Sequence, residues 1–505
     1  MAADKSPIDE ALLYRQEDLR LLHRQEDLRD EVDYDMEQLL LPTGSDMEQQ
    51  LLLPTDGGSF CMTGASFGRS CLNLSNVISG IGMLSIPYAL SQGGWLSLTL
   101  FAIVGAICFY TGNLIDRCMR ADHCVRSYLD IGYLAFGSYG LVMYVELYLV
   151  VTSFLILEGD NLDKLLPGIV VEILGYQVHG KQLFVLAAAA VILPTTWLKN
   201  LSMVAYVSAV GLVSSVALTA SLVWAGVAGK GFHMEGSSLL NLSGLPTALS
   251  LYFVLAFHME GSSLLNLSGL PTALSLYFVC FAGHGVFPTV YSSMNSKKIF
   301  LRVLCYRTAY HSSGINRCLE AIRVASQLYL VLLISSVLCS LNYTVTAVLG
   351  YLIYGEDVQA QVTLNLPTGK LYTRIAILTT LITPLEKYAL VIQPVTIAIE
   401  EKLSATTDTE INRLTRVLTS TAVVISTVVL ACTVPFFGYL MSFIGSSLNV
   451  TVAVLFLCLS YLKIYISRGG VGFFEMAAII GILVIGVCVA VVGAYTSLPQ
   501  IIGTF

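Results

Sequence analysis

The sequence predicts an all-α polytopic membrane protein with about eleven transmembrane helices. The chain has 505 residues, of which 55% are hydrophobic and only 12% are charged, whereas soluble proteins carry about 25% charged residues. Its mean hydropathy is +0.74. From Phe67 almost to the end of the chain, apolar runs recur that are long enough to cross a bilayer, which needs about 20 residues.

The predicted spans follow one another with short connections. We place them at 67–92, 94–116, 139–163, 182–199, 203–227, 270–294, 327–353, 371–400, 412–434, 437–463 and 473–497. A shorter segment, 126–138, is expected to form an interfacial helix before the third span. The N-terminus is charged and lacks the apolar run of a signal peptide, so the first span is expected to direct insertion.

The placement of Lys and Arg predicts the orientation in the membrane. Fifteen such residues lie in loops on the same side as the N-terminus, and five lie in loops on the opposite side. Because cytoplasmic loops carry the excess of positive charge, we expect a cytoplasmic N-terminus and a lumenal or external C-terminus.

Residues 1–58 differ from the predicted transmembrane domain, 59–500. They hold fifteen acidic and five basic side chains, and their low hydrophobicity predicts a disordered tail. Asp35 stands four residues before Leu39-Leu40, a pattern that either addresses the protein to a sorting adaptor or arises by chance. The acidity gives no sign of nucleic-acid binding.

Two segments do not fit a membrane bundle. Residues 232–254 recur identically at 257–279, so 232–256 is an apparent duplicate and we take the second copy as the start of the sixth span. Internal repeats of transporters are only weakly similar, so the identity indicates recent duplication or an assembly error. The basic segment 299–326 is either a retained intron or a cytoplasmic loop.

The first span is interrupted near its middle. Gly80-Ile81-Gly82 weakens the helix, and Pro87 removes a backbone donor shortly after. In lipid a broken helix is tolerated only where protein buries the freed backbone or where it lines a cavity. The break therefore indicates either a binding site at mid-membrane or close packing of two helices at glycine.

The sixth span has a matching break at Gly283-His284-Gly285, followed by Pro288. Interrupted helices at corresponding positions of two halves indicate the binding site of an inverted-repeat transporter. There, half-helix N-termini hold anionic groups, and freed carbonyl groups hold an ammonium or a cation. The second break makes a binding site the favoured interpretation of the first.

Several runs of sequence resemble one known family. They are SGIGMLSIPYALSQGGW, RSYLDIGYLAFG, ELYLVVTSFLILEGDNL and VLGYLIYGEDVQAQVTLNLPT, in this order along the chain. With them the chain resembles the amino acid/auxin permease superfamily, and more closely the plant and fungal vacuolar amino acid transporters related to the vesicular GABA transporter. The similarity covers about 60–298 and 327–500.

The resemblance implies a LeuT-like 5+5 inverted repeat with broken helices 1 and 6, and proton-coupled movement of neutral amino acids across the vacuolar or another internal membrane. The proton is the implied coupling ion, sodium is less favoured, and no cofactor is implied. The resemblance assigns substrate binding to residues of the two breaks, which are Asn76, Ser79, Gly80, Ile81, Gly82, Phe281, Ala282, Gly283 and His284.

Ionisable and hydroxyl groups inside the spans are candidates for ion coupling, because they are expensive to place in a bilayer. Glu146 in the third span is either a proton carrier or a buried carboxyl with a partner, for which we consider Lys387. Thr379, Thr380 and Thr383 either form a hydroxyl cation site, as in sodium-coupled relatives, or bond to carbonyls of their own helix. His284 is a proton relay or a lining group, and Glu158 and Asp160 are expected to be wet or capping.

The sequence contains no sign of an enzyme. It has no HExxH motif, no nucleophile with a base and no carboxylate pair within one span, and its twelve cysteines contain no CxxC pair or metal-ligand spacing. The alternatives to a neutral amino acid transporter are an amino acid sensor that signals through its N-terminal tail and an auxin-type carrier.

Overall fold

The computed structural model describes residues 67–121, 125, 127–137, 141–173, 176–197, 204–230, 265–288, 314–407, 413–434, 436–466 and 470–503. Side chains of 314–328 are not among those described. The predicted tail 1–58 with Asp35, Leu39 and Leu40, the first copy of the duplicate and 299–313 lie outside the described residues. All described residues belong to one structural unit, Thr63–Phe505.

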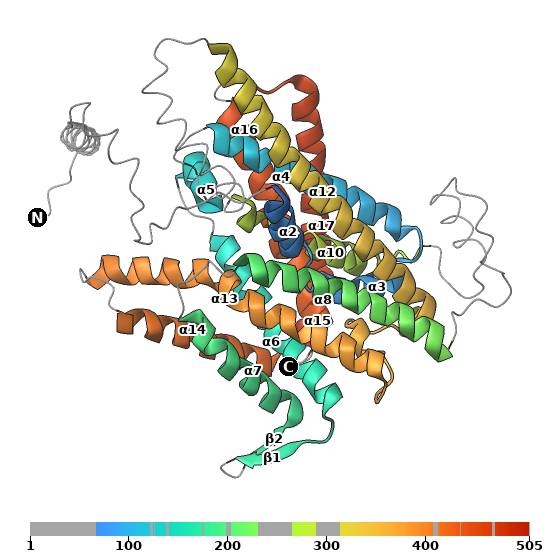
Figure 1. Ribbon diagram of the computed structural model, residues 1–505. Helices are drawn as coiled ribbons and strands as arrows, with labels where there is room; N and C mark the ends of the chain where they lie inside the picture. The colour runs from blue at the N-terminus through green and yellow to red at the C-terminus, as the bar shows by residue number, and fades with distance from the viewer. Residues whose placement is uncertain are drawn as a thin grey trace, which may run out of the picture. The chain divides into compact units, whose positions relative to one another are not determined.

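The described residues form helices and one β-hairpin (Figure 1). The elements are α2 (Phe67–Ile78), α3 (Gly82–Gly93), α4 (Ser97–Ala121), α5 (Tyr128–Phe136), α6 (Leu141–Leu165), β1 (Val170–Ile173), β2 (Tyr176–His179), α7 (Gly180–Thr196), α8 (Val204–Ala225), η3 (Gly226–Lys230), α10 (Leu270–Cys280), η4 (His284–Val286), α12 (Gly314–Tyr354), η5 (Gly355–Asp357), η6 (Val362–Leu364), α13 (Leu371–Thr407), α14 (Arg413–Thr433), α15 (Phe437–Phe443), η7 (Ile444–Asn449), η8 (Thr451–Phe456), α16 (Leu457–Ile466) and α17 (Phe473–Ile502).

The predicted class, an all-α polytopic membrane protein, is confirmed. Within the described residues eight helices are long and apolar enough to cross a membrane, and the pair α2 and α3, bent by 47°, makes a ninth. The shorter apolar helices α7 and α10 occupy the fourth and sixth predicted spans. Each of the eleven predicted ranges contains helix, while the number of spans by length alone is eight or nine.

The structure differs from the prediction in several places. Helix α12 begins at Gly314 instead of 327, and α13 continues to Thr407 instead of 400, because hydropathy does not detect helical turns that are polar. The tenth predicted span contains two π-helical stretches, η7 and η8. The hairpin of β1 and β2, in which Val170 pairs with His179, is absent from the prediction.

The short helix predicted at 126–138 is present as α5. Ser127 and Asp130 form a capping box at its start, and Gly137 ends it in the left-handed conformation with φ of 69°. The Tyr128 hydroxyl donates to the Val452 carbonyl at 2.6 Å, which attaches α5 to η8.

The packing repeats after five spans. The pair α2/α3 packs on α12 and α8, and its counterpart α10 packs on α4 and on α15/η7. Likewise α6 packs on α7 and α13 packs on α14, while α3 contacts α10 and α6 contacts α13 across the two halves. Because five is an odd number of crossings, the second half runs in the opposite direction, which is the predicted 5+5 inverted repeat.

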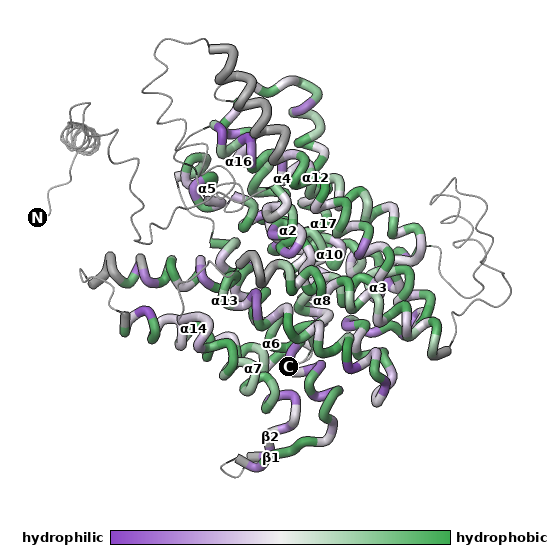
Figure 2. Tube along the Cα trace, viewed as in Figure 1, coloured by the Kyte–Doolittle hydropathy of each residue, from purple (hydrophilic) through white to green (hydrophobic). Residues whose placement is uncertain are grey.

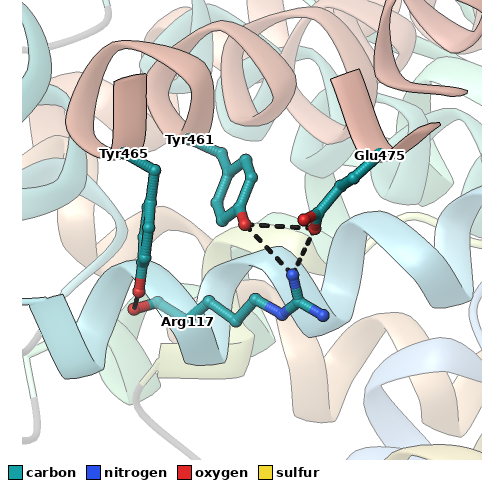
Figure 3. A network of polar contacts seen from close by, with 4 residues as sticks. All are labelled: Arg117, Tyr461, Tyr465 and Glu475. Carbon is teal, nitrogen blue, oxygen red and sulfur yellow. Dashed lines mark hydrogen bonds and ion pairs between the residues drawn. The ribbon is translucent and has the colours of Figure 1, made fainter. Parts of the chain in front are cut away.

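Helix α17 lies outside this repeat and is the most exposed of the spans. Only 17% of the most apolar 18-residue stretch of α17 is buried in the protein. Figure 2 shows this helix as hydrophobic along most of its length. Its first turn is fixed by a polar network with α4 and α16 (Figure 3). There Arg117 pairs with Glu475 and donates to the Tyr461 hydroxyl at 3.0 Å, and Tyr461 donates to Glu475 at 3.1 Å.

Candidate functional site

The break in the first span is held by backbone and side-chain bonds. Helix α2 ends at Ile78, and the Gly80 amide donates to the Ile78 carbonyl at 2.7 Å in a tight turn before α3 begins. The Ser79 hydroxyl donates to that of Ser215 on α8 at 2.8 Å. The interruption is therefore stabilised by specific hydrogen bonds.

Tyr343 of α12 bridges the break. Its hydroxyl accepts the Gly80 amide at 3.0 Å and donates to the Ile78 carbonyl at 2.8 Å, and the side chain is 1% exposed. This residue is absent from the predicted site. A tyrosine inside an apolar span is a usable signal, since its hydroxyl usually finds a partner when buried, but the sequence does not say which partner.

Lys387 of α13 binds the end of α2. Its ammonium group donates to the carbonyls of Asn76 at 2.7 Å and Ser79 at 2.8 Å, and the side chain is 7% exposed. A cation is favoured at this place, because the C-terminus of a helix carries about half a negative charge. The hypothesis that Lys387 pairs with Glu146 is wrong: no ion pair joins them in the described part of the chain.

The second break has a different local geometry. Helix α10 ends at Cys280, and Gly283 has φ of 134°, a conformation that favours glycine. Asn449 of η7 donates its side-chain amide to the Phe278 carbonyl in the last turn of α10. The ring of His284 points to α4, where Nε2 lies 3.1 Å from both the Cys108 carbonyl and the Thr111 hydroxyl.

The two breaks pack against each other through glycine. A Cβ on Gly82 would stand 3.0 Å from the Cys280 backbone, and one on Gly283 would stand 2.7 Å from Val77. Gly80 differs, because the nearest atom to a Cβ there would be the Ile78 oxygen at 3.9 Å. Gly82 and Gly283 thus allow close helix packing, whereas Gly80 leaves open space.

A cavity lies beside the first break. It measures about 30 Å³, enough for about two water molecules. No charged side chain among the described residues lines it, and it brings together residues of the break itself and of α3, α6, α8 and α13. The lining residues are Ser79, Gly80, Ile81, Met83, Leu84, Leu157, Ser214, Ser215, Leu218, Thr379, Thr380 and Thr383.

The predicted site is therefore divided. The cavity joins Ser79, Gly80 and Ile81 to all three predicted threonines of α13. The other predicted binding residues do not line it, and they are Asn76, Gly82, Phe281, Ala282, Gly283 and His284.

The threonines of α13 differ in their hydrogen bonds. The Thr379 hydroxyl donates to the carbonyls of Ile375 and Ala376 in its own helix, at 2.8 and 3.0 Å. The Thr380 hydroxyl is buried and has no partner among the described residues. Thr380 therefore offers a hydroxyl to a ligand or water in the cavity.

The acidic residues of α6 are deeply buried. Glu146 is 6% exposed and does not line the cavity. Glu158 is 2% exposed, so the expectation of a wet side chain is wrong; its Oε1 has no hydrogen-bond partner in the described part. Asp160 behaves as expected of an end group, since it pairs with Lys181 at 2.6 Å and accepts from Gln361 at 2.6 Å.

A family match covers most of the chain. Residues 63–311 and 323–498 match the family described as transmembrane amino acid transporter protein. The chain belongs to this family. The interruption of the match at 312–322 lies within the segment 299–326 that the sequence singles out as an insertion.

Similar proteins are named as amino acid transporters. The chain is 41% identical to the amino acid transporter AVT1I of Arabidopsis thaliana, over 87% of this chain and 96% of that protein. It is 33% identical to AVT1E of the same plant, over 90% and 76% respectively. A weaker match, 27% identical over 26% of this chain and 27% of that protein, is to the vesicular inhibitory amino acid transporter of Xenopus laevis.

A solved structure of a manganese transporter from Eremococcus coleocola matches with a TM-score of 0.49 and 10% identity, covering 92% of this chain and 90% of that one. Family membership makes this protein an amino acid transporter of the membrane and not an enzyme.

Proposed function

We propose that the protein is a secondary active transporter that couples a proton to the movement of neutral amino acids across the vacuolar or another internal membrane. The observation that carries the proposal is the first break, where a half-helix N-terminus, a hydroxyl-lined cavity and a lysine ammonium group meet.

The amino acid is recognised at the start of α3. The N-terminus of a helix carries about half a positive charge, so the start of α3 suits a carboxylate. Because none of the described residues that line the adjacent cavity is charged, a substrate with a neutral side chain is favoured. The cavity holds about two waters and is smaller than an amino acid, so substrate binding requires the helices to part, as in alternating access.

The proton is favoured over sodium by the bonds of Lys387. A sodium ion bound at the break would use freed carbonyl oxygens as ligands. Two of these, on Asn76 and Ser79, accept hydrogen bonds from Lys387 instead. The ammonium group of Lys387 thus stands where a metal cation would bind.

The internal-membrane location rests on the resemblance to vacuolar transporters and on the acidic dileucine pattern of Asp35, Leu39 and Leu40. Imaging of the tagged full-length chain, with and without replacement of both leucines by alanine, tests it. Localisation to the plasma membrane in both forms contradicts the proposed address and the sorting role of the pattern.

Transport is tested with the full-length protein in proteoliposomes. An imposed pH gradient should drive accumulation of neutral amino acids, a sodium gradient at equal pH should not, and lysine or glutamate should compete poorly. Binding of an amino acid without any net flux would overturn the proposal and favour the sensor. Uptake driven by sodium alone would overturn the proton coupling.

A further inference from the structure

We infer that Lys387 is the proton-exchanging group that couples the ion gradient to movement of α2. The inference rests on the proposed function and adds the residue and the element through which the proton acts. It departs from the expectation that Glu146 carries the proton.

The contacts of Lys387 connect two elements with different roles. Lys387 belongs to α13, which packs on α6, α7, α8 and α14 and so forms part of a packed scaffold. Its ammonium group reaches the last turn of α2 and the break itself, at the carbonyls of Asn76 and Ser79. This side chain therefore attaches the end of the half-helix α2 to the scaffold, beside the Ser79–Ser215 hydrogen bond to α8.

The strength of this attachment depends on the charge of Lys387. An ammonium group makes charge-assisted hydrogen bonds, which are about twice as strong as neutral ones, and it also meets the negative end of the α2 dipole. A neutral amine loses both advantages. Release of the proton should therefore loosen α2 at the break and allow it to move.

The titratable groups around Lys387 are few. On α13 itself, Glu386 is the neighbour of Lys387 in sequence. The side chains of Glu386 and Asn76 both reach Gly211 of α8, because a Cβ added there would stand 2.3 Å from Glu386 Oε1 and 2.2 Å from Asn76 Oδ1. On α12 the Cys339 thiol donates to the Ser75 carbonyl at 3.3 Å. Neither oxygen of Glu386 has a hydrogen-bond partner among the described residues, so this carboxylate keeps the capacity to accept a proton that Lys387 releases.

The proton transfer requires no reactant other than Lys387 and a proton acceptor. One N–H bond of the Lys387 ammonium group breaks, the proton passes to the Glu386 carboxylate or to water, and the lysine is left as a neutral amine. When the carboxylate accepts the proton, it becomes a neutral acid, so the pair loses two opposite charges together.

Within the described part of the chain, Glu146 has no comparable connection to the first break. It is buried in α6 but does not line the cavity. Lys387, in contrast, contacts the carbonyl groups of the interrupted helix directly.

The experiment compares two activities of the same proteoliposomes. Accumulation driven by a pH gradient requires coupling, whereas counterflow exchange of a labelled amino acid at equal pH requires only binding and movement of the loaded protein. With one proton per amino acid, a gradient of one pH unit supports about tenfold accumulation. The variants are Lys387→Gln, which cannot exchange a proton, and Lys387→Arg, which keeps the charge permanently.

We expect both variants to lose accumulation and the pH dependence of transport. Lys387→Gln should keep counterflow, whereas Lys387→Arg should slow it, because a permanent charge keeps α2 attached. Lys164→Gln is the matched control, because Lys164 also donates to backbone carbonyls, those of Thr363, Leu364 and Leu366, away from the break. This control should retain accumulation.

The possible outcomes separate the inference from the proposed function. Failure of the unmodified protein to accumulate any amino acid overturns the proposed function. Accumulation by the unmodified protein and equally by a folded Lys387 variant overturns only the inference. If Lys387→Gln does not fold, Lys387→Arg decides the matter, since normal accumulation by the arginine variant contradicts the inference.

Discussion

Gly82 of α3 lies against the backbone of Cys280 of α10, so closely that an added Cβ would stand 3.0 Å from the Cys280 nitrogen and Cα. The two interrupted spans thus meet at the point where one restarts and the other ends. Neither half-helix can move relative to the other without changing this contact.

Replacement of Gly82 by alanine should destabilise the protein, because the obstacle is backbone that cannot turn aside. Overpacking of this kind costs about 1–3 kcal/mol, and thermal unfolding in detergent measures it. Gly481→Ala on α17 is the matched control: no atom lies within 4 Å of its added Cβ, and alanine favours a helix by about 1 kcal/mol. A Gly82 variant as stable as the control would contradict the close contact.

Tyr343→Phe should weaken the break without changing the shape of the core. The hydroxyl is the bridge between the Gly80 amide and the Ile78 carbonyl, and loss of a buried hydrogen-bond partner costs about 1–3 kcal/mol. Hydrogen exchange of the peptide that contains residues 78–82 should become faster. Tyr329→Phe on the same helix is the control, because Tyr329 is 47% exposed and its ring makes an edge-to-face contact with Phe109. Equal exchange in the two variants would argue against the bridge.

Thr380→Val and Thr379→Val should separate the two roles available to threonine in α13. The Thr379 hydroxyl is satisfied by its own helix, so its loss should change transport little. The Thr380 hydroxyl is without a partner in the described residues and faces the cavity. Its loss should raise the KM for the amino acid about tenfold, which corresponds to one hydrogen bond of about 1.4 kcal/mol. A larger effect at Thr379 would reverse this assignment.

The sequence predicts the elements of this fold well and their partners poorly. Apolar length and local Gly and Pro locate the spans and both breaks, because these signals lie within one segment. The contacts of Tyr343 and Lys387 with the first break join positions 263 to 311 residues apart, and no local pattern carries that information. The sequence favours Glu146 as a functional group because it is a carboxyl in an apolar run. Only the packing of the helices shows which buried ionisable side chain contacts the break.

Corresponding spans of the two halves support the two breaks, a relationship that composition does not reveal. Tyr343 on α12 contacts the first break, and α4, the counterpart of α12, holds His284 of the second. Ser215 on α8 contacts Ser79 of the first break, and Asn449 of η7, in the span that corresponds to α8, holds the end of α10. The repeat therefore preserves which spans support a break while the side chains differ, so sequence comparison of the halves would not detect it.

Gly211→Ala should impair coupling more than stability. Its Cβ would stand 2.2 Å from Asn76 Oδ1 and 2.3 Å from Glu386 Oε1. Both obstacles are ends of side chains, which can turn aside, so the free energy of unfolding should fall by about 1 kcal/mol or less. This rotation of the side chains moves Glu386 and Asn76 away from Lys387. Because of this displacement, pH-driven accumulation should fall while counterflow exchange persists.

A second substitution checks this explanation of the Gly211 variant. Asn76→Ala removes one of the two obstacles, and neighbouring sites that share a contact should couple in a double-mutant cycle. The double variant should regain stability relative to the sum of the single changes, as measured by thermal unfolding. Strict additivity would mean that Gly211 and Asn76 do not touch and would remove the reason for placing Glu386 against the end of α2.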